Sequence, residues 1–232
     1  MAASYTTRRG ELETYFDRTA VDAWKRLTSD APLGRIRRTV RAGRTRMRAT
    51  LLDWLPRDLS GRRLLDAGCG TGALAVEAAR RGAEVLAIDL SPTLIGLARE
   101  RVPAHIGAGA IEFRVGDMHD AGLGEFDHVV AMDSLIHYRC EDAVPVIAAL
   151  AARTRSSVLV TFAPSTPALR LLHAAGRLLP RGNRAPAIEP VGEHVLHARL
   201  GAEPALAGWQ ARRTQRVASG FYTSQGLELV RR

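Results

Sequence analysis

Short apolar runs alternate with amphipathic stretches through the middle of the chain, from about residue 62 to residue 162. Each run has the length of a buried strand, and each stretch between runs has the periodicity of a helix. We therefore predict an α/β domain in which helices cover both faces of a mainly parallel sheet. The expected strands contain residues 64–65, 84–91, 111–118, 126–138 and 156–164, and the expected helices span residues 73–81, 93–101 and 141–153.

Residues 1–60 precede this core and predict a helical arm. The first helix is expected at residues 15–27, where its aromatic side chains either pack on the sheet or close over a ligand. The second is expected at residues 35–54, where seven arginines accompany an apolar stripe. We expect the stripe to dock and the arginines to face outward, either as a solvated face or as a surface for carboxylates or anionic lipid headgroups.

The chain after residue 164 departs from this alternation. Prolines punctuate residues 164–208, and we expect an insertion that covers the substrate, with a helix at 168–180 that is either a cover or an ordinary packed helix. Two strand-like runs around Gly220 then predict an antiparallel hairpin that completes a seven-stranded sheet. Residues 61–232 are therefore expected to form one domain behind the arm.

A glycine-rich loop follows the first expected strand, in the sequence LLDAGCGTG at residues 64–72. Glycine tolerates positive φ and has no Cβ, so such a loop lets a ligand approach the backbone before the next helix begins. Taken alone, the spacing also fits a tight turn in any α/β domain. The residues assigned to this cradle are Asp66, Gly68, Cys69, Gly70 and Gly72.

Acidic residues follow the next three expected strands. Asp89 is placed to accept hydrogen bonds from both hydroxyls of a ribose, and Asp117 to meet the edge of an adenine. Because the carboxyl ends of parallel strands share one edge of a sheet, these side chains and the glycine loop are expected to line one crevice. The cofactor residues assigned to these strand ends are Asp89, Leu90, Asp117, Met118 and Asp133.

This set of residues resembles the class I S-adenosylmethionine-dependent methyltransferases, in which an acid precedes the glycine loop as Asp66 does here. The resemblance implies a Rossmann-like fold with S-adenosylmethionine as the methyl donor. Dinucleotide-binding dehydrogenases are the nearest alternative. Their G-x-G-x-x-G fingerprint does not match G-C-G-T-G, and no second nucleotide-binding half follows, so this class is disfavoured.

Composition indicates which partners and which cellular compartment suit the domain. The 232 residues include 33 basic and 24 acidic side chains, a net charge of +9, which suits nucleic acid, an anionic membrane surface or an acidic substrate. The two cysteines lack metal-type spacing, which indicates free thiols in a reducing compartment such as the cytosol. No apolar run reaches the length of a membrane span, so we expect a soluble or peripheral protein.

The segment just past the apolar core of the fourth expected strand bears on the acceptor. Methylation of amino groups is usually served by a (D/N)-P-P-(Y/F) tetrad, whereas this chain has D-S-L-I-H-Y at residues 133–138. Methylation of nucleobase amino groups is therefore disfavoured, and no carboxylate cluster for a catalytic metal is evident. His137 and Tyr138 stand in the acceptor position. A carboxylate acceptor would fit, because it is ionised at neutral pH and needs no strong base.

Four segments resemble the magnesium protoporphyrin IX O-methyltransferase family. They are YFDRTAVDAW at residues 15–24, LLDAGCGTG at 64–72, LIHY at 135–138 and GFYTSQGLELV at 220–230. The resemblance covers nearly the whole chain and implies methyl transfer from S-adenosylmethionine to one propionate of magnesium protoporphyrin IX. The product would be the monomethyl ester of chlorophyll and bacteriochlorophyll biosynthesis. The magnesium would belong to the substrate, with no metal held by the protein.

The same resemblance implies roles for individual side chains. Tyr15 and His137 are expected to act at the acceptor, with Tyr15 closing over the donor and the carboxylate and His137 orienting the propionate. For His137 two alternatives stay open, ligation of the porphyrin magnesium and a structural bond to a backbone carbonyl. The residues expected to bind the substrate are Tyr138, Arg170, Arg177 and Tyr222.

Other functions and partners also stay open. The chain could methylate another hydrophobic carboxylate or hydroxyl compound, or it could be a basic RNA-binding protein with a methyltransferase-like fold. The acids at positions 66, 89 and 117 argue against the RNA-binding alternative, because they form a complete cofactor set. The family resemblance allows a cytoplasmic enzyme that lies at the photosynthetic membrane and contacts a magnesium chelatase subunit. No feature of the sequence predicts the oligomeric state.

Overall fold

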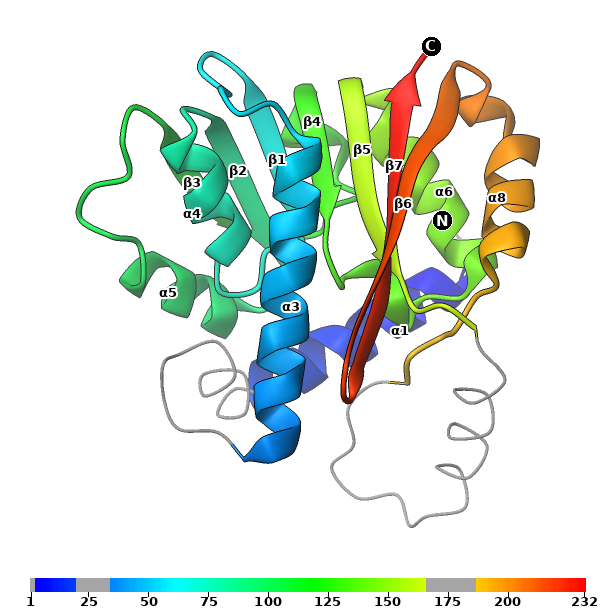
Figure 1. Cartoon of the computed structure of the whole chain (residues 1–232), viewed down its shortest axis with the longest axis horizontal. Helices are drawn as coiled ribbons and strands as arrows, with labels where there is room; N and C mark the ends of the chain where they lie inside the picture. The colour runs from blue at the N-terminus through cyan, green and yellow to red at the C-terminus, as the bar shows by residue number, and fades with distance from the viewer. Residues whose placement is uncertain (1–2, 20–33, 166–186) are drawn as a thin grey trace.

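A seven-stranded sheet forms the centre of the computed structural model, which describes residues 3–19, 34–165 and 187–232. The strand order is β3-β2-β1-β4-β5-β7-β6 (Figure 1). Strands β1 to β5 pair in parallel, and β7 lies antiparallel between β5 and β6. The strands are β1 (Arg63–Ala67), β2 (Glu84–Asp89), β3 (Ala110–Val115), β4 (Phe126–Ala131), β5 (Thr154–Phe162), β6 (Trp209–Ser219) and β7 (Tyr222–Arg231). The predicted mainly parallel sheet with a C-terminal hairpin is confirmed.

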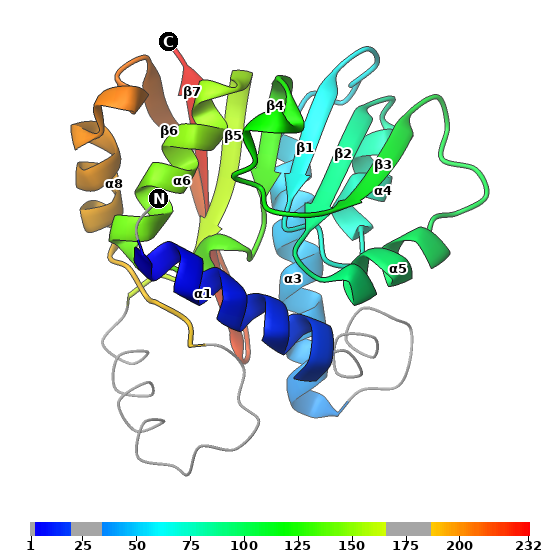
Figure 2. The ribbon, with the colours of Figure 1, turned by 180° about the vertical axis from the view of Figure 1, so that it is seen from behind.

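Helices cover both faces of the sheet, as the alternating pattern predicts. On one face, α3 (Arg35–Trp54) and α4 (Ala73–Arg80) pack in one apolar cluster with residues of β1, β2 and β7. On the other, α6 (Cys140–Ala152) and α8 (Glu193–Ala202) share a second cluster with β4 and β5 (Figure 2). Helix α5 (Pro92–Glu100) lies beside β2 and β3. Every residue of β4 is buried, as expected for a central parallel strand.

Two helices among the described residues differ from the sequence expectations. Helix α1 (Ala3–Thr14) begins twelve positions before the expected helix at 15–27, and residues Tyr15–Thr19 form a π-helical turn. Helix α1 is largely polar and buries only Tyr5 and Leu12 among its apolar residues, too few for a visible stripe. Helix α8 lies within the expected insertion at 164–208. The expected helix at 168–180 lies outside the described residues, so the covering role of the insertion stays a prediction.

The fourth strand is shorter than the apolar pattern predicts. Strand β4 ends at Ala131, whereas the expected strand continues to residue 138. The chain turns at Asp133, which has φ 54, and then forms the 3-10 turn η3 (Leu135–His137). The apolar residues after β4 are buried by this turn rather than by strand pairing. The break brings the segment 133–138 to the end of the sheet where β1 to β3 also finish.

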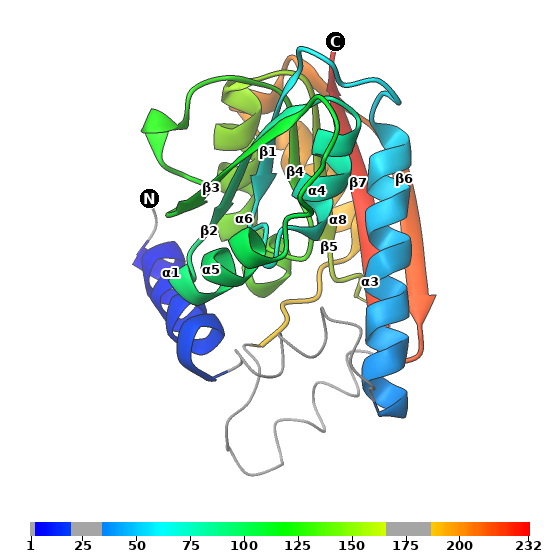
Figure 3. The same cartoon turned by 90° about the vertical axis from the view of Figure 1, so that its left-hand side faces the viewer.

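The carboxyl ends of the parallel strands point toward one end of the molecule, where α1 crosses beneath them (Figure 2). Helix α3 runs along the opposite face of the sheet and its first turn projects at the same end (Figure 3). Strand ends, α1 and α3 therefore converge on one region, and this arrangement places the functional site.

Candidate cofactor and acceptor site

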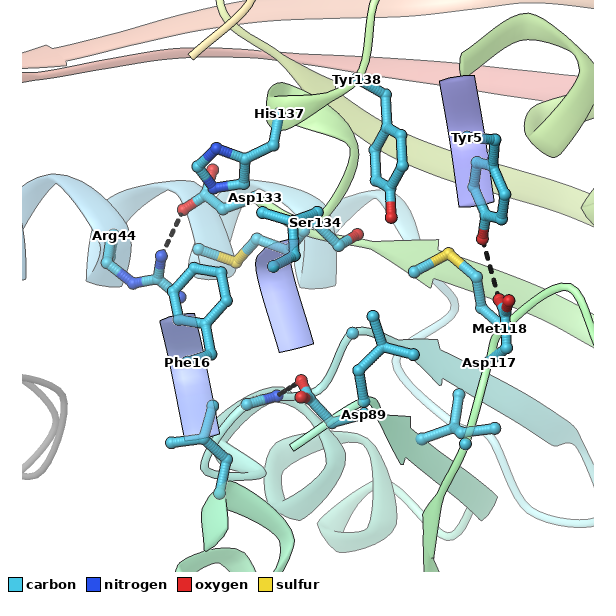
Figure 4. Close-up of a pocket in the computed structure, with 18 residues that line it drawn as sticks. Tyr5, Phe16, Arg44, Asp89, Asp117, Met118, Asp133, Ser134, His137 and Tyr138 are labelled. Carbon is cyan, nitrogen blue, oxygen red and sulfur yellow. Dashed lines mark hydrogen bonds and ion pairs between the residues drawn. The ribbon is translucent and has the colours of Figure 1, made fainter. Parts of the chain in front are cut away.

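A pocket lies at the carboxyl ends of β1 to β4 and is closed from outside by side chains of α1, η1 (Tyr15–Thr19) and α3 (Figure 4). It contains about 700 Å³ of empty space, part of which is open to solvent. The predicted residues that line it are Gly68, Gly70, Asp89, Leu90, Asp117, Met118, Asp133, His137 and Tyr138.

The glycine loop after β1 has the conformation that its sequence requires. Gly68, Gly70 and Gly72 have φ of 80°, 54° and 75°, values that favour glycine. A Cβ on Gly68 would lie 2.5 Å from Ser134 Cβ, and one on Gly72 would lie 2.8 Å from the Phe113 ring. A Cβ on Gly70 would meet no atom within 4 Å. The loop is therefore packed closely at Gly68 and Gly72 but leaves space at Gly70. Such space lets a ligand approach the backbone.

Asp89 joins this loop to the end of β2. Its Oδ2 accepts a hydrogen bond from Gly70 N at 2.8 Å, and its Oδ1 accepts one from Ser91 N at 3.0 Å. Burial raises the pKa of Asp89, whereas these backbone donors lower it. Each carboxylate oxygen carries two lone pairs, so both oxygens can also accept from the paired hydroxyls of a ribose. The geometry fits the predicted role.

Three residues assigned to the cradle do not line the pocket. Asp66 is buried beneath it, and its Oδ2 accepts a hydrogen bond from Ala75 N at 3.1 Å in the first turn of α4. Burial and the nearby Asp89 raise the pKa of Asp66 to about 7, against the opposing effect of the Ala75 N–H. The carboxyl group of Asp66 thus holds the start of α4 in place. Cys69 and Gly72 form the loop without facing the cavity.

Asp117 contacts a tyrosine that sequence reasoning missed. The Tyr5 hydroxyl of α1 donates to Asp117 Oδ1 at 2.8 Å, and Arg9 Nη1 lies 3.2 Å from Asp117 Oδ2. The Tyr5 ring stacks on Tyr138, with centroids 5.0 Å apart and planes inclined by 20°. Burial, together with the charge of Asp117, raises the pKa of Tyr5, so the hydroxyl stays a donor. Helix α1 therefore covers the end of the pocket that is expected to bind adenine.

Asp133 is held by hydrogen bonds to residues of three elements, α3, β5 and β7. Its carboxylate accepts from Arg44 Nη1 at 2.8 Å, from the Tyr222 hydroxyl at 3.1 Å, and from Ser224 Oγ at 3.1 Å. Its backbone N–H donates to Thr161 Oγ1 at 2.7 Å. These contacts give Asp133 a structural function that the sequence did not reveal. Direct contact of Asp133 with the cofactor stays a prediction.

Arg44 is a further lining residue that sequence reasoning passed over, because it is one of seven arginines on α3. A signal for it was present. Arg44 lies four residues after Val40 and three before Met47, in the middle of the apolar stripe. An arginine in such a position needs a buried partner, and the side chain of Asp133, only 3% exposed, supplies it. The ion pair brings α3 to the end of β4.

His137 lies at the side of the pocket formed by η3. Its Nδ1 lies 3.3 Å from the carbonyl oxygen of Ala187, and its ring centroid lies 5.8 Å from that of Phe16. A carbonyl oxygen only accepts, so Nδ1 is the donor in this contact and carries a proton. This contact corresponds to the structural alternative for His137. It also fixes the ring orientation, which either acceptor role would require.

Of the other residues predicted at the acceptor side, only some line the pocket within the described part of the chain. Tyr15 is half-buried and makes an edge-to-face contact with Phe16, at 5.2 Å between centroids, but Phe16 rather than Tyr15 lines the pocket. Tyr138 lines the pocket, and its ring extends toward the space that Asp89 faces from the other side (Figure 4). Tyr222 lies behind the pocket on Asp133. Arg170 and Arg177 lie outside the described residues, so their substrate contacts stay predictions.

Residues 3–19, 34–165 and 187–232 contain neither a metal-type cluster of side chains nor a helix that could span a membrane. Within these ranges no group of three or more His, Cys, Asp or Glu side chains could hold a metal ion. Within the same part of the chain, no helix has both the length and the apolar character of a membrane span.

Two family models match the chain. The one described as magnesium-protoporphyrin IX methyltransferase C-terminus matches residues 131–231, and the one described as methyltransferase domain matches residues 64–157. A crystal structure of magnesium protoporphyrin IX methyltransferase from Synechocystis PCC 6803 with bound SAH superposes with a TM-score of 0.84. It is 30% identical, and the match covers 96% of this chain and 99% of that one. The expected class I fold is confirmed.

Two curated relatives match nearly the whole chain. Magnesium-protoporphyrin O-methyltransferase of Rhodobacter capsulatus is 48% identical over 98% of this chain and 99% of the relative. The protein of the same name from Synechocystis is 31% identical over 95% of each chain. Both matches span the arm, the glycine loop and the hairpin, so they are not confined to a shared cofactor domain. The chain therefore belongs to the magnesium-protoporphyrin O-methyltransferase family.

Proposed function

We propose that the protein transfers a methyl group from S-adenosylmethionine to a propionate carboxylate of magnesium protoporphyrin IX, giving the monomethyl ester in chlorophyll or bacteriochlorophyll biosynthesis. The observation that carries the proposal is one pocket that joins the Gly70–Asp89 contact to His137. A cofactor-binding strand edge and an acceptor-side imidazole thus face the same space. The near full-length similarity to magnesium-protoporphyrin methyltransferases supports the choice of acceptor.

The residues that would hold the methyl donor are those of the glycine loop and the next two strand ends. When bound, S-adenosylmethionine supplies an electrophilic methyl group on a sulfonium. Asp89 accepts from the ribose hydroxyls, the backbone at Gly68 and Gly70 lets the ligand approach, and Asp117 with Met118 meets the adenine. Tyr5 and Arg9 already contact Asp117, so α1 sets the orientation of that carboxylate.

The acceptor side needs alignment and exclusion of water more than base strength. A propionate is ionised at neutral pH, and its oxygen must lie in line with the methyl group that it attacks. Phe16 and Tyr138 border this part of the pocket with rings that exclude water, which leaves the carboxylate oxygen less masked by hydration. His137 orients the propionate, with Tyr15 closing beside it through its contact on Phe16.

The remaining substrate contacts belong to the same proposal. Tyr138 borders the porphyrin, Tyr222 supports the acceptor wall through Asp133, and Arg170 and Arg177 bind the propionate that is not methylated. Arginine forks suit a carboxylate on a large apolar ring. A cytoplasmic protein that lies peripherally at the photosynthetic membrane and contacts a magnesium chelatase subunit completes the proposal. The net charge of +9 supports a partner or surface that is anionic.

A methyl-transfer assay tests the proposed reaction. Purified protein is incubated with S-adenosylmethionine and magnesium protoporphyrin IX, and the product is identified by mass as a single methyl ester. Metal-free protoporphyrin and a simple lipophilic acid run beside it. Ester on the magnesium porphyrin alone supports the proposal, whereas ester only on the lipophilic acid would assign the enzyme to another hydrophobic carboxylate.

A further inference from the structure

Two large apolar side chains are exposed at the end of the molecule where the pocket opens. Phe221, in the turn between β6 and β7, is 69% exposed, and Ile36, in the first turn of α3, is 55% exposed. These are the highest values among the exposed large apolar residues of the described chain. An exposed phenylalanine beside an exposed isoleucine is costly in water and indicates a surface that meets a partner.

Contacts between α3 and the hairpin hold these two side chains at one site. Thr39 Oγ1 donates to the carbonyl oxygen of Ile36 at 2.8 Å and accepts from Phe221 N at 3.4 Å. Gly220 has φ 57, and a Cβ there would lie 2.6 Å from Thr39 Oγ1. The turn is therefore seated on α3, and the apolar pair is presented by a firm support rather than by a loose loop.

The surroundings of this pair are strongly basic. Arg35, Arg37 and Arg38 are all exposed in the first turns of α3. Residues 34–52 contain no acidic side chain, and neither do residues 205–227, which include β6 and the turn. We call Arg35, Ile36, Arg37, Arg38 and Phe221 the basic tip. No acidic side chain within these two stretches balances its positive charge.

The position of the basic tip relates it to the active site. The start of α3 and the β6–β7 turn lie at the end of the molecule toward which the parallel strands point, the same end that α1 crosses on the opposite face of the sheet (Figure 1, Figure 3). Arg44 lines the pocket from the same helix, two to three turns after Arg35. A surface bound at the basic tip would therefore lie near the pocket mouth.

We propose that the basic tip docks on an anionic lipid bilayer, with Phe221 and Ile36 entering the boundary between headgroups and acyl chains and the arginines pairing with lipid phosphates. Apolar residues ringed by cationic ones suit that boundary. Two apolar side chains are too few for the core of a stable protein interface, which favours lipid over an acidic protein. This inference deepens the peripheral location in the proposed function and gives it a surface.

Vesicle co-sedimentation tests the inference with the full chain and without methyl donor or porphyrin. The vesicles are phosphatidylcholine alone, or phosphatidylcholine with an equal amount of phosphatidylglycerol. We expect binding to the anionic vesicles only. Phe221→Ser should weaken it about tenfold, and Arg37→Gln with Arg38→Gln about twentyfold. Methyl transfer to detergent-dispersed porphyrin should stay unchanged in these variants, so failure of this inference and failure of the proposed reaction are distinguishable.

Matched controls separate docking from general adsorption. Val195→Ser removes an apolar side chain that is 39% exposed on α8. Arg231→Gln with Arg232→Gln removes the same charge at the far end of β7. Both should bind vesicles as the unmodified protein does. Equal weakening by control and tip variants, or no binding to anionic vesicles, would overturn the inference.

A fluorescence measurement covers the case in which a tip variant folds poorly. Phe221→Trp should gain a blue-shifted signal on anionic vesicles that brominated lipid quenches, relative to the unmodified protein. Val195→Trp should not be quenched. A signal at position 221 that changes with protein concentration but not with lipid would mean self-association instead and would contradict the inference.

Discussion

Asp133 shows at the scale of one residue how the acceptor wall is built. Its φ of 54 is uncommon for any residue other than glycine, and aspartate is among the side chains that tolerate it best. The cost of this backbone conformation is offset by the donors around the carboxylate, which come from α3 and β7. The turn that presents His137 to the pocket therefore depends on residues distant in sequence.

Asp133→Asn should destabilise the protein by about 2 kcal/mol, because it leaves Arg44 without a charged partner while keeping the size of the side chain. The free energy of unfolding is measured by urea denaturation. Glu125→Gln breaks the exposed pair with Arg155 and should cost much less, because solvent screens that pair. Similar losses in the two variants would mean that the Asp133 contacts contribute nothing beyond an ordinary surface pair.

His137 and Asp89 should separate turnover from cofactor binding. His137→Ala is expected to lower kcat with little change in the affinity for S-adenosylmethionine, because the imidazole faces the acceptor side. Asp89→Ala should weaken donor binding directly, because it removes the carboxylate that holds Gly70. Calorimetric titration with the donor and single-turnover rates give the two quantities. Equal loss of donor affinity in both variants would contradict this division of roles.

Asp66 predicts a pH dependence of stability. Its folded pKa of about 7 is above the usual value for aspartate, so protonation favours the folded state. The resulting stability is present below the unfolded pKa and is lost as pH rises through the folded value. Relative to Asp66→Asn, the unmodified protein should lose about 2 kcal/mol between about pH 5 and about pH 7.5. A constant difference across this range, measured by urea unfolding, would refute the assignment.

At the scale of elements, the contact between α3 and the hairpin depends on a helical glycine. A Cβ on Gly43 would lie 2.3 Å from the Tyr222 ring, whereas one on Gly10 in α1 would meet no atom within 4 Å. Gly43→Ala should therefore destabilise the protein by about 2 kcal/mol despite the better helix propensity of alanine. Gly10→Ala should be neutral or stabilising. Thermal unfolding compares the two, and an equal gain in both would show that the hairpin can shift away from α3.

The helices and strands of the structure can be compared with those that the sequence predicts. The expected helix at 35–54 matches α3, because its apolar residues recur at helical spacing. The strand expected at 126–138 ends early at Ala131, since a run of apolar residues does not distinguish strand pairing from burial by a turn. Helix α1 was missed because its burial comes from distant contacts such as the one between Tyr5 and Asp117.

The site residues that could be predicted are likewise those with a local signal in the sequence. The glycine loop and the acids after β2 and β3 were predictable, because motif spacing and strand ends are local properties of the chain. Tyr5 and Arg44 were not predicted, because each meets its partner only after folding, at separations of 112 and 89 residues. Arg44 interrupts an apolar stripe, and this signal would have distinguished it from the other arginines of α3.

At the scale of the whole molecule, one sheet separates two apolar clusters and directs its strand ends to one functional end. The pocket lies at that end, and so do α1, the start of α3 and the β6–β7 turn (Figure 1). This arrangement suits a substrate that combines carboxylates with a large apolar ring, because it places cationic and apolar surfaces beside the cofactor edge. The arginines of the basic tip therefore lie at the functional end of the molecule, in addition to raising the net charge.

If the pocket methylates a propionate carboxylate of magnesium protoporphyrin IX, a porphyrin with both carboxylates blocked must not accept the methyl group. The most direct test supplies a trideuteromethyl-labelled S-adenosylmethionine and compares the diacid porphyrin with its dimethyl ester, in which both carboxylates are blocked. We expect one labelled methyl group on the diacid, removable by alkali as expected for an ester, and none on the dimethyl ester. Label on the dimethyl ester, or on neither compound while the donor is bound, would contradict the proposed reaction.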